Sequence, residues 1–235
     1  MKKILGIVIL TSYSLAAQIS LNDSRISDAY TDLTNRITPR SLNNSNETVK
    51  GSPYLDTAFK EATLVYFGKP LEEQVYLRYN AFADEMEMSL NSFATSTDQV
   101  LIKNSKVFCK IQGEEFRYLP LTNGNSTLGK MGYVREVYKG QHYSLYLREW
   151  KTFREGKKAR TSLERSFPAR FVDESEWYFQ KKEGPLEFIK PNKKNFKKYF
   201  KTDLVHLETF LKTKKGDMKK MEYLKKLLRF MDEVK

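Results

Sequence analysis

The sequence has little of what catalytic and metal-binding sites require. It contains one cysteine, Cys109, and two histidines, His142 and His206, among 235 residues. One cysteine cannot form an internal disulfide, and neither histidine has a metal-ligand partner at helical or strand spacing. We therefore expect a fold held together by its core, with no catalytic residue, no cofactor and no metal. Cys109 is expected to be buried, and both histidines are expected at the surface.

The sequence also lacks an apolar run long enough to cross a membrane. The longest apolar stretch near the start, residues 4–10, follows two lysines and is followed by small residues that favour cleavage between Ala16 and Ala17. A transmembrane helix needs about 20 apolar residues. The pattern predicts a signal peptide over residues 1–16 and a location in the periplasm, at the cell surface or outside the cell. No cysteine lies beside the cleavage point, so we expect no lipid anchor, and no transmembrane segment after cleavage.

What is abundant is positive charge, and it is unevenly distributed. Residues 17–150 hold 15 basic and 16 acidic side chains, whereas residues 151–170 hold seven basic and two acidic ones. Residues 181–235 hold 17 basic and eight acidic side chains, most of the basic ones lysine. Such asymmetry indicates attraction to anionic partners. The alternative is that the lysines only solvate short helices.

We expect these partners to be anionic lipid headgroups, acidic glycans or an acidic protein. Lysine is a hydrated point charge, which suits diffuse attraction better than the bidentate recognition that arginine provides. The predicted anion-binding residues are eight lysines of the C-terminal segment: Lys193, Lys194, Lys197, Lys198, Lys219, Lys220, Lys225 and Lys226.

Nucleotides and nucleic acids are not expected partners. Residues 124–130 have the spacing of a phosphate-binding loop, but Met131 stands where a magnesium-binding hydroxyl should follow the lysine. The next residues alternate like a strand rather than opening a helix. The many tyrosines and arginines could form a stacking platform for single strands, but an antiparallel sheet uses the same residue types as strand formers.

Residues 51–190 alternate with a period of two. Apolar positions recur at every second residue in runs such as 75–79, 86–90, 107–111 and 143–147, with turn residues between the runs. The pattern predicts a mainly β (α+β) fold: a curved antiparallel meander or small barrel of roughly eight to ten strands. Residues 17–50 form a polar segment with a linker and a helical stripe, namely Ile26, Tyr30, Leu33 and Ile37.

Residues 191–235 change to a helical period and predict a short lysine-rich helical segment. One helix is expected over 195–200, a second around 204–211, and a third that Asp217 caps. The third has an apolar stripe formed by Met218, Met221, Leu224, Leu228 and Met231. We expect this stripe to pack on the sheet or on the other helices. The alternative is an amphipathic helix lying on a membrane surface.

One acidic cluster offers an alternative function. Asp84, Glu85 and Glu87 could supply the paired carboxylates of a secreted hydrolase. In a strand Glu85 and Glu87 would share one face, about 7 Å apart. Solvated strand faces have the same pattern, so we expect a non-enzymatic binding or accessory protein and keep the hydrolase as the alternative.

Several short motifs resemble a family of uncharacterised exported β-rich proteins of Gram-negative bacteria. They are the stretch 50–55 with the pattern K-G-[ST]-P-Y-L, the run Leu77-Arg78-Tyr79-Asn80, and the lysine-rich segments near 193–196 and 224–230. The resemblance covers about residues 50–235. It implies a periplasmic or surface location and no established activity.

Overall fold

The structure is a computed structural model, and it describes residues 34–36, 49–97, 99–122, 130–161 and 163–235. The predicted signal peptide lies outside the described residues, and so does most of the polar segment that follows it.

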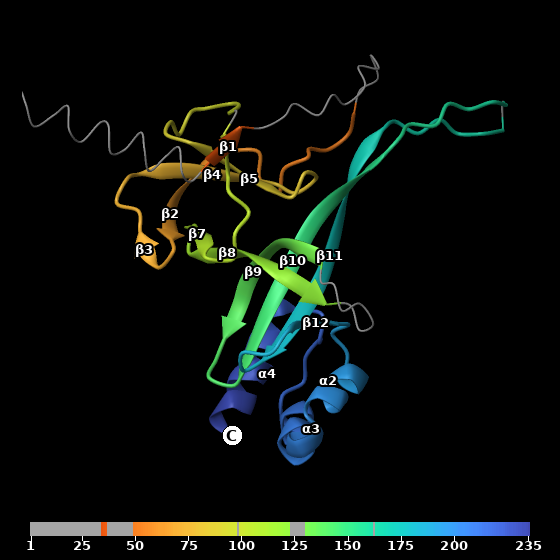
Figure 1. Ribbon diagram of the computed structural model, residues 1–235. Helices are drawn as coiled ribbons and strands as arrows, with labels where there is room; N and C mark the ends of the chain where they lie inside the picture. The colour runs from red at the N-terminus through yellow and green to blue at the C-terminus, as the bar shows by residue number, and fades with distance from the viewer. Residues whose placement is uncertain (1–33, 37–48, 98, 123–129, 162) are drawn as a thin grey trace, which may run out of the picture.

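The described chain is mostly β, with three α-helices at its C-terminal end (Figure 1). Its strands, in chain order, are β1 (Thr34–Arg36), β2 (Lys60–Tyr66), β3 (Lys69–Pro70), β4 (Val75–Asn80), β5 (Glu85–Ser89), β6 (Gln99–Leu101), β7 (Val107–Ile111), β8 (Glu114–Thr122), β9 (Lys130–Lys139), β10 (Tyr143–Arg154), β11 (Arg170–Lys181) and β12 (Leu186–Ile189). The β-rich fold with a short helical C-terminal segment is confirmed.

The sheet differs from the expected meander in two respects. Twelve strands share one sheet, in the order β1-β6-β5-β4-β2-β7-β8-β12-β11-β10-β9, with β3 paired to β2. The sheet is mixed, because β12 pairs with β8 in parallel while the other pairings are antiparallel. Strand β8 also pairs with β9, so the pairings of β8, β9, β10, β11 and β12 close into a circuit.

The hairpin between β7 and β8 shows how the local sequence sets the strand connections. Gln112 and Gly113 both have positive φ, at 53° and 85°. A two-residue turn of this type matches the twist of the flanking strands and favours glycine at its second position. The turn fixes the register in which Ile111 faces Glu114 and Cys109 faces Phe116. Cys109 is buried, as expected, and burial raises the pKa of its thiol well above the usual range.

Three apolar clusters form the interior. The first core lies under the N-terminal strands and includes Leu64, Leu77, Tyr79, Met86, Met88, Cys109 and Phe116. The inner core lies within the circuit of β8–β12 and consists of Leu121, Val134, Tyr146, Tyr178 and Leu186. The helix core joins the outer face of β10–β12 to the helices and includes Tyr143, Leu145, Phe179, Ile189, Phe196, Phe200, Leu207, Phe210, Tyr223, Leu224, Leu227, Leu228 and Met231.

The helices are α2 (Lys193–Tyr199), α3 (Leu204–Thr213) and α4 (Met221–Glu233), with a single 3₁₀ turn at Lys201–Asp203. The expected apolar stripe of the third helix does pack on the sheet and the other helices. Asp217 does not cap α4, whose N-cap is Lys220 without a side-chain bond. Instead the Asp217 carboxylate accepts the backbone N–H of Lys219 at 2.9 Å and closes the turn before the helix.

The predicted N-terminal helical stripe is not a helix where it can be followed. Residues 34–36 form β1 and pair antiparallel with β6, with Asn35 opposite Val100. The four apolar residues of the stripe lie outside the described residues. An isolated helix shorter than about 12–15 residues is only marginally stable in water, so pairing with a sheet edge competes well with it.

Candidate anion-binding surface and cavity

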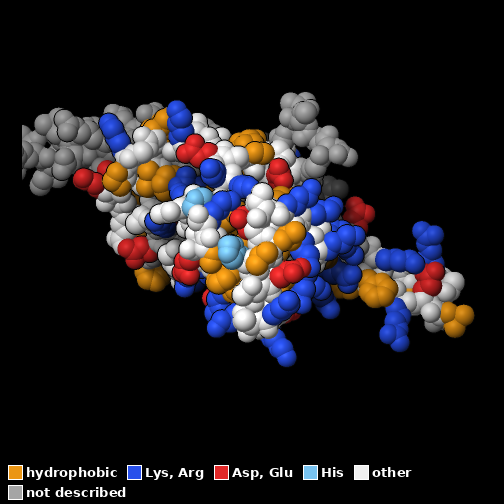
Figure 2. Space-filling view, turned by 90° about the horizontal axis from the view of Figure 1, so that it is seen from below, with side chains coloured by type: hydrophobic (Ala, Val, Ile, Leu, Met, Phe, Trp, Pro, Cys, Tyr) orange, Lys and Arg blue, Asp and Glu red, His pale blue; other side chains and the backbone are white. Residues whose placement is uncertain are grey.

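Helix α2 carries the densest group of the predicted anion-binding lysines. Phe196 and Phe200 are fully buried in the helix core, which fixes the orientation of the helix. Asn192 caps it by accepting the backbone N–H of Asn195 at 2.9 Å. The four lysines at 193, 194, 197 and 198 are consequently exposed. Figure 2 shows that Lys and Arg side chains gather over the helical end on the side from which the β10–β11 hairpin projects.

The other four predicted lysines flank or belong to α4. Lys219, Lys220 and Lys226 are exposed, and Lys225 is half-buried. Within the part of the chain that the structure describes, two of the eight lysines form an ion pair: Lys197 with Glu208 at 2.7 Å and Lys225 with Glu222 at 3.0 Å. Six of the eight therefore present their charge to solvent without an acidic partner.

The apolar faces of the helices are used inside the molecule. Leu224, Leu227 and Leu228 are fully buried, and Phe210 packs against Tyr223 with ring centroids 5.6 Å apart. A helix cannot lay the same face on a membrane while it packs on a sheet. The alternative of an amphipathic membrane-surface helix therefore does not fit this packing, and α4 offers its partners charge only.

The end of α4 is tied to the β9–β10 turn by polar contacts that the sequence analysis missed. The Asp232 carboxylate accepts the Tyr138 hydroxyl at 2.6 Å and the backbone N–H of His142 at 2.8 Å. Burial and this carboxylate raise the pKa of Tyr138 far above its usual value. The His142 ring lies 3.4 Å from Asp232, so it is half-buried rather than at the surface as expected. His206 is exposed on α3, as expected.

Lys235 makes a second contact of this kind. Its ammonium donates to the Tyr143 hydroxyl at 3.0 Å and lies 3.5 Å from Asp203. These two partners, the hydroxyl first, raise the pKa of Lys235. The contacts join residues about 90 positions apart, and no local pattern in the sequence indicates them. They fix the helices on the sheet, so the lysine surface is held in one orientation.

The carboxylates of the alternative hydrolase are occupied by structural contacts. Glu87 forms a buried ion pair with Arg78, at 2.5 Å from Nη2 and 3.0 Å from Nε. Asp84 accepts the Tyr79 hydroxyl at 2.7 Å and the backbone N–H of Tyr133 at 3.2 Å. A glycosidase needs one carboxyl to donate a proton to the substrate and the other to act on the sugar. Glu87 is closed off by Arg78, and Glu85 is half-buried with its carboxylate 3.8 Å from the Lys103 ammonium, so each of the three carboxylates has a structural partner.

Arg78 is itself enclosed on all sides. The rings of Tyr54 and Phe59 cover its guanidinium at 3.8 and 4.3 Å, and Nη1 donates to the carbonyl oxygens of Thr57 and Thr95. The ion pair therefore holds two loops against the outer face of β4 and β5. A buried pair whose guanidinium makes four hydrogen bonds is a structural element rather than a reactive one.

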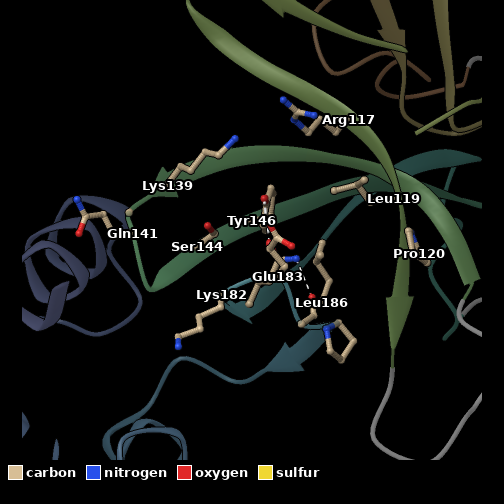
Figure 3. A pocket seen from close by; sticks show the side chains of 14 residues that line it. Arg117, Leu119, Pro120, Lys139, Gln141, Ser144, Tyr146, Lys182, Glu183 and Leu186 are labelled. Atoms are coloured by element: carbon tan, nitrogen blue, oxygen red, sulfur yellow. Dashed lines mark hydrogen bonds between the residues drawn. The ribbon is translucent and has the colours of Figure 1, made fainter. Parts of the chain in front are cut away.

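A cavity of about 860 Å³ opens between β8, the β9–β10 turn and the β11–β12 turn. Figure 3 shows Arg117 and Lys139 on one side and Lys182 on another, with Tyr146 and Glu183 between them. The Tyr146 hydroxyl lies 3.3 Å from Gln180 Oε1, and burial raises the pKa of Tyr146 to about 12. The walls thus combine three cations with an apolar floor.

Acidic side chains compensate the charge of this cavity. Arg117 Nε donates to Glu115 at 2.5 Å, and Glu136 Oε2 lies 3.8 Å from Lys139 and 3.9 Å from Arg117. Glu136 Oε2 is buried without a hydrogen-bond partner, and burial raises the pKa of this carboxyl. With three acids beside three bases, the cavity does not select ligands by the sign of their charge. The predicted lysines of α2 and α4 carry more unbalanced positive charge than the cavity does.

Among the described residues, no helix has both the length and the apolarity needed to span a bilayer. Comparisons of the chain with protein-family models, with curated proteins and with solved structures find no match. The function proposed below is therefore supported by the geometry and charge of this chain alone.

Proposed function

We propose that this chain is an exported, non-enzymatic binding protein whose basic helical end, residues 191–235, holds an anionic partner. One observation carries the proposal. The helices place their apolar faces in the helix core and leave six of the eight predicted lysines exposed, with no acidic partner among the described residues. The surface that remains for a partner is cationic.

The arrangement on α2 argues against solubility as the full explanation. Lys193 and Lys197, and likewise Lys194 and Lys198, stand four residues apart on one seven-residue helix. Like charges at this spacing destabilise a helix by about 0.2–0.5 kcal/mol per pair. A helix that only needed to be soluble could alternate lysine with glutamate. The repulsion within these two lysine pairs supports a functional requirement for positive charge on α2.

Several anionic partners fit this surface: lipid headgroups, acidic glycans or an acidic protein. Lysine attracts an anion without fixing its geometry. Binding should therefore weaken as ionic strength rises, because the screening length falls from about 10 Å at 0.1 M salt to about 3 Å at 1 M.

The proposal is tested by removing charge without removing packing. In the test variant Lys193, Lys194 and Lys198 are all replaced by glutamine; these side chains are exposed and have no acidic partner in the described chain. Binding to dextran sulfate and to vesicles containing phosphatidylglycerol is measured at several salt concentrations. We expect a loss of at least tenfold in affinity for the anionic probe that binds, and a weaker salt dependence.

A matched control removes the same net charge elsewhere. Lys69, Lys103 and Lys106 are exposed on the N-terminal strands and their loops, and the control replaces all three by glutamine. We expect it to bind like the parent chain. Equal losses in both variants would mean that net charge rather than the helical end matters. Absence of binding to both probes would remove the proposal.

A further inference from the structure

The β10–β11 hairpin forms an arm, residues 151–170, that projects from the body of the molecule (Figure 1). The two strands pair without a break from Tyr143 opposite Lys181 to Arg154 opposite Arg170. Beyond the strands, Lys157 and Phe167 exchange two backbone hydrogen bonds of 2.8 Å each. The arm is therefore ordered by its own backbone to near its end.

The root of the arm is fixed on the sheet. Phe171 packs edge-on against Phe153 and Phe82, with ring centroids 5.3 and 5.4 Å away. Lys50 donates its backbone N–H to the Ala169 carbonyl at 2.8 Å and accepts the Phe171 N–H at 3.0 Å. On the first strand, the Lys151 N–H donates to the Ala81 carbonyl at 3.0 Å. A fixed root and a projecting end let the arm present its tip at a defined distance from the body.

Two large apolar side chains at the end of the arm are exposed. The Leu163 side chain is 96% exposed and that of Phe167 is 52% exposed. Glu164 lies between them in sequence and serves the turn, since its carboxylate accepts the Arg160 backbone N–H at 3.2 Å and lies 3.6 Å from the Lys157 ammonium. Leu163 is the most exposed large hydrophobic residue among the described residues, and it stands where an outside surface would meet the arm first.

Basic side chains surround these two. The arm holds seven basic residues against two acidic ones, and Lys157, Arg160 and Arg165 are exposed near the tip. Figure 2 shows the basic side of the helical end continuing along the arm, with hydrophobic side chains among the basic ones. An exposed apolar side chain with cations beside it is the combination that the interface of a bilayer with anionic headgroups accommodates.

We propose that the arm inserts Leu163 and Phe167 into the interfacial region of an anionic bilayer, while Lys157, Arg160 and Arg165 contact the headgroups. This inference rests on the proposed function and names its partner as a lipid surface. An acidic protein or glycan would meet the same cations. It would not require an apolar side chain as exposed as Leu163 at the end of the arm.

The experiment uses the burial of the native thiol. Cys109 is 1% exposed, so a Leu163→Cys variant carries one reactive thiol for an environment-sensitive nitrobenzoxadiazole label. Labelled full-length protein is mixed with vesicles of phosphatidylcholine alone or with 30 mol% phosphatidylglycerol, with or without nitroxide-labelled lipid. We expect a blue-shifted, brighter emission and nitroxide quenching with the anionic vesicles only. A label at Phe93→Cys, a side chain 90% exposed on the β5–β6 loop, is the matched control and should stay in water.

A second variant separates insertion from charge, because it removes the apolar side chains without adding a charge. Leu163→Gln with Phe167→Gln should lower affinity for anionic vesicles at least tenfold and leave dextran sulfate binding within about twofold. Vesicle binding with the label at position 163 still in water overturns the insertion and leaves the proposed function standing. Dextran sulfate binding without vesicle binding overturns the lipid partner, and loss of both overturns the two proposals together.

Discussion

The two ends of the sheet close their cores in different ways. The N-terminal strands bury an ion pair, Arg78–Glu87, beneath two loops on the face opposite the first core. The C-terminal strands are covered by helices whose aromatic and leucine side chains complete the helix core. In the first region the charged side chains Arg78 and Glu87 are buried and paired with each other. In the second region the lysines are exposed and outnumber the acidic side chains. Charge is structural at one end of the molecule and available for binding at the other.

The sharpest way to break this comparison is to remove one partner of the buried pair. We expect Glu87→Ala to lower the free energy of unfolding by about 4 kcal/mol, because an uncompensated buried guanidinium is left behind. Urea denaturation followed by circular dichroism measures the loss. Replacing Arg78 and Glu87 together by methionine should recover most of it; a single variant as stable as the parent would show that the pair is not structural.

A second prediction tests whether the helices are part of the fold. Leu224 is fully buried between α4 and the sheet, so Leu224→Ala should lower the free energy of unfolding by about 3 kcal/mol. Hydrogen exchange should show faster opening of β10 and β11 as well as of α4. Faster exchange in α4 alone would mean that the helical segment unfolds independently. Val205→Ala, on the exposed side of α3, is the control and should change little.

Removing the contacts of Asp232 at the end of α4 should have an intermediate effect on the free energy of unfolding. Asp232→Ala leaves the Tyr138 hydroxyl and the His142 N–H without their acceptor, at a cost of about 2 kcal/mol. The same variant should lower the pKa of Tyr138, since the carboxylate contributes to raising it. Ultraviolet titration of the tyrosines measures the second effect, and an unchanged titration curve would contradict the contact.

The smallest expected effect concerns Glu136 and depends on pH. Burial raises the pKa of this carboxyl in the folded protein, so the folded chain keeps the proton to higher pH than the unfolded chain does. Stability from this group is therefore full below the unfolded pKa and is lost as pH rises through the folded pKa. Glu136→Gln should raise the Tm by about 1–3 °C at pH 7 and by almost nothing below about pH 4. A lower Tm at pH 7 would show that the contacts with Lys139 and Arg117 outweigh burial.

The sequence predicts individual strands better than the way they assemble. Alternation places Val75, Leu77 and Tyr79 on one face of β4, and these side chains do lie in the first core. The same alternation assigns Glu87 to the opposite face, but not what covers that face. The strand count and the parallel pairing of β12 with β8 were also missed, because distant segments make those contacts.

The candidate surface was partly predictable for a similar reason. A lysine run with a helical apolar stripe determines that the apolar side packs and the lysines face water, which the buried Phe196 and Phe200 confirm for α2. In the sequence, the arm could be recognised only as a stretch rich in basic residues. Its projecting hairpin and the exposed Leu163 depend on strand pairing over many residues.

Composition and periodicity by themselves determined that this chain folds around an apolar core without disulfides, alternates as strands and ends in short basic helices. These properties are local, because the periodicity that predicts them is read over a few neighbouring residues. Tertiary structure alone decided that the rings of Tyr54 and Phe59 cover the Arg78–Glu87 pair and that Asp232 fixes the helices on the β9–β10 turn. Those outcomes depend on contacts between residues far apart in the sequence, which no local pattern predicts.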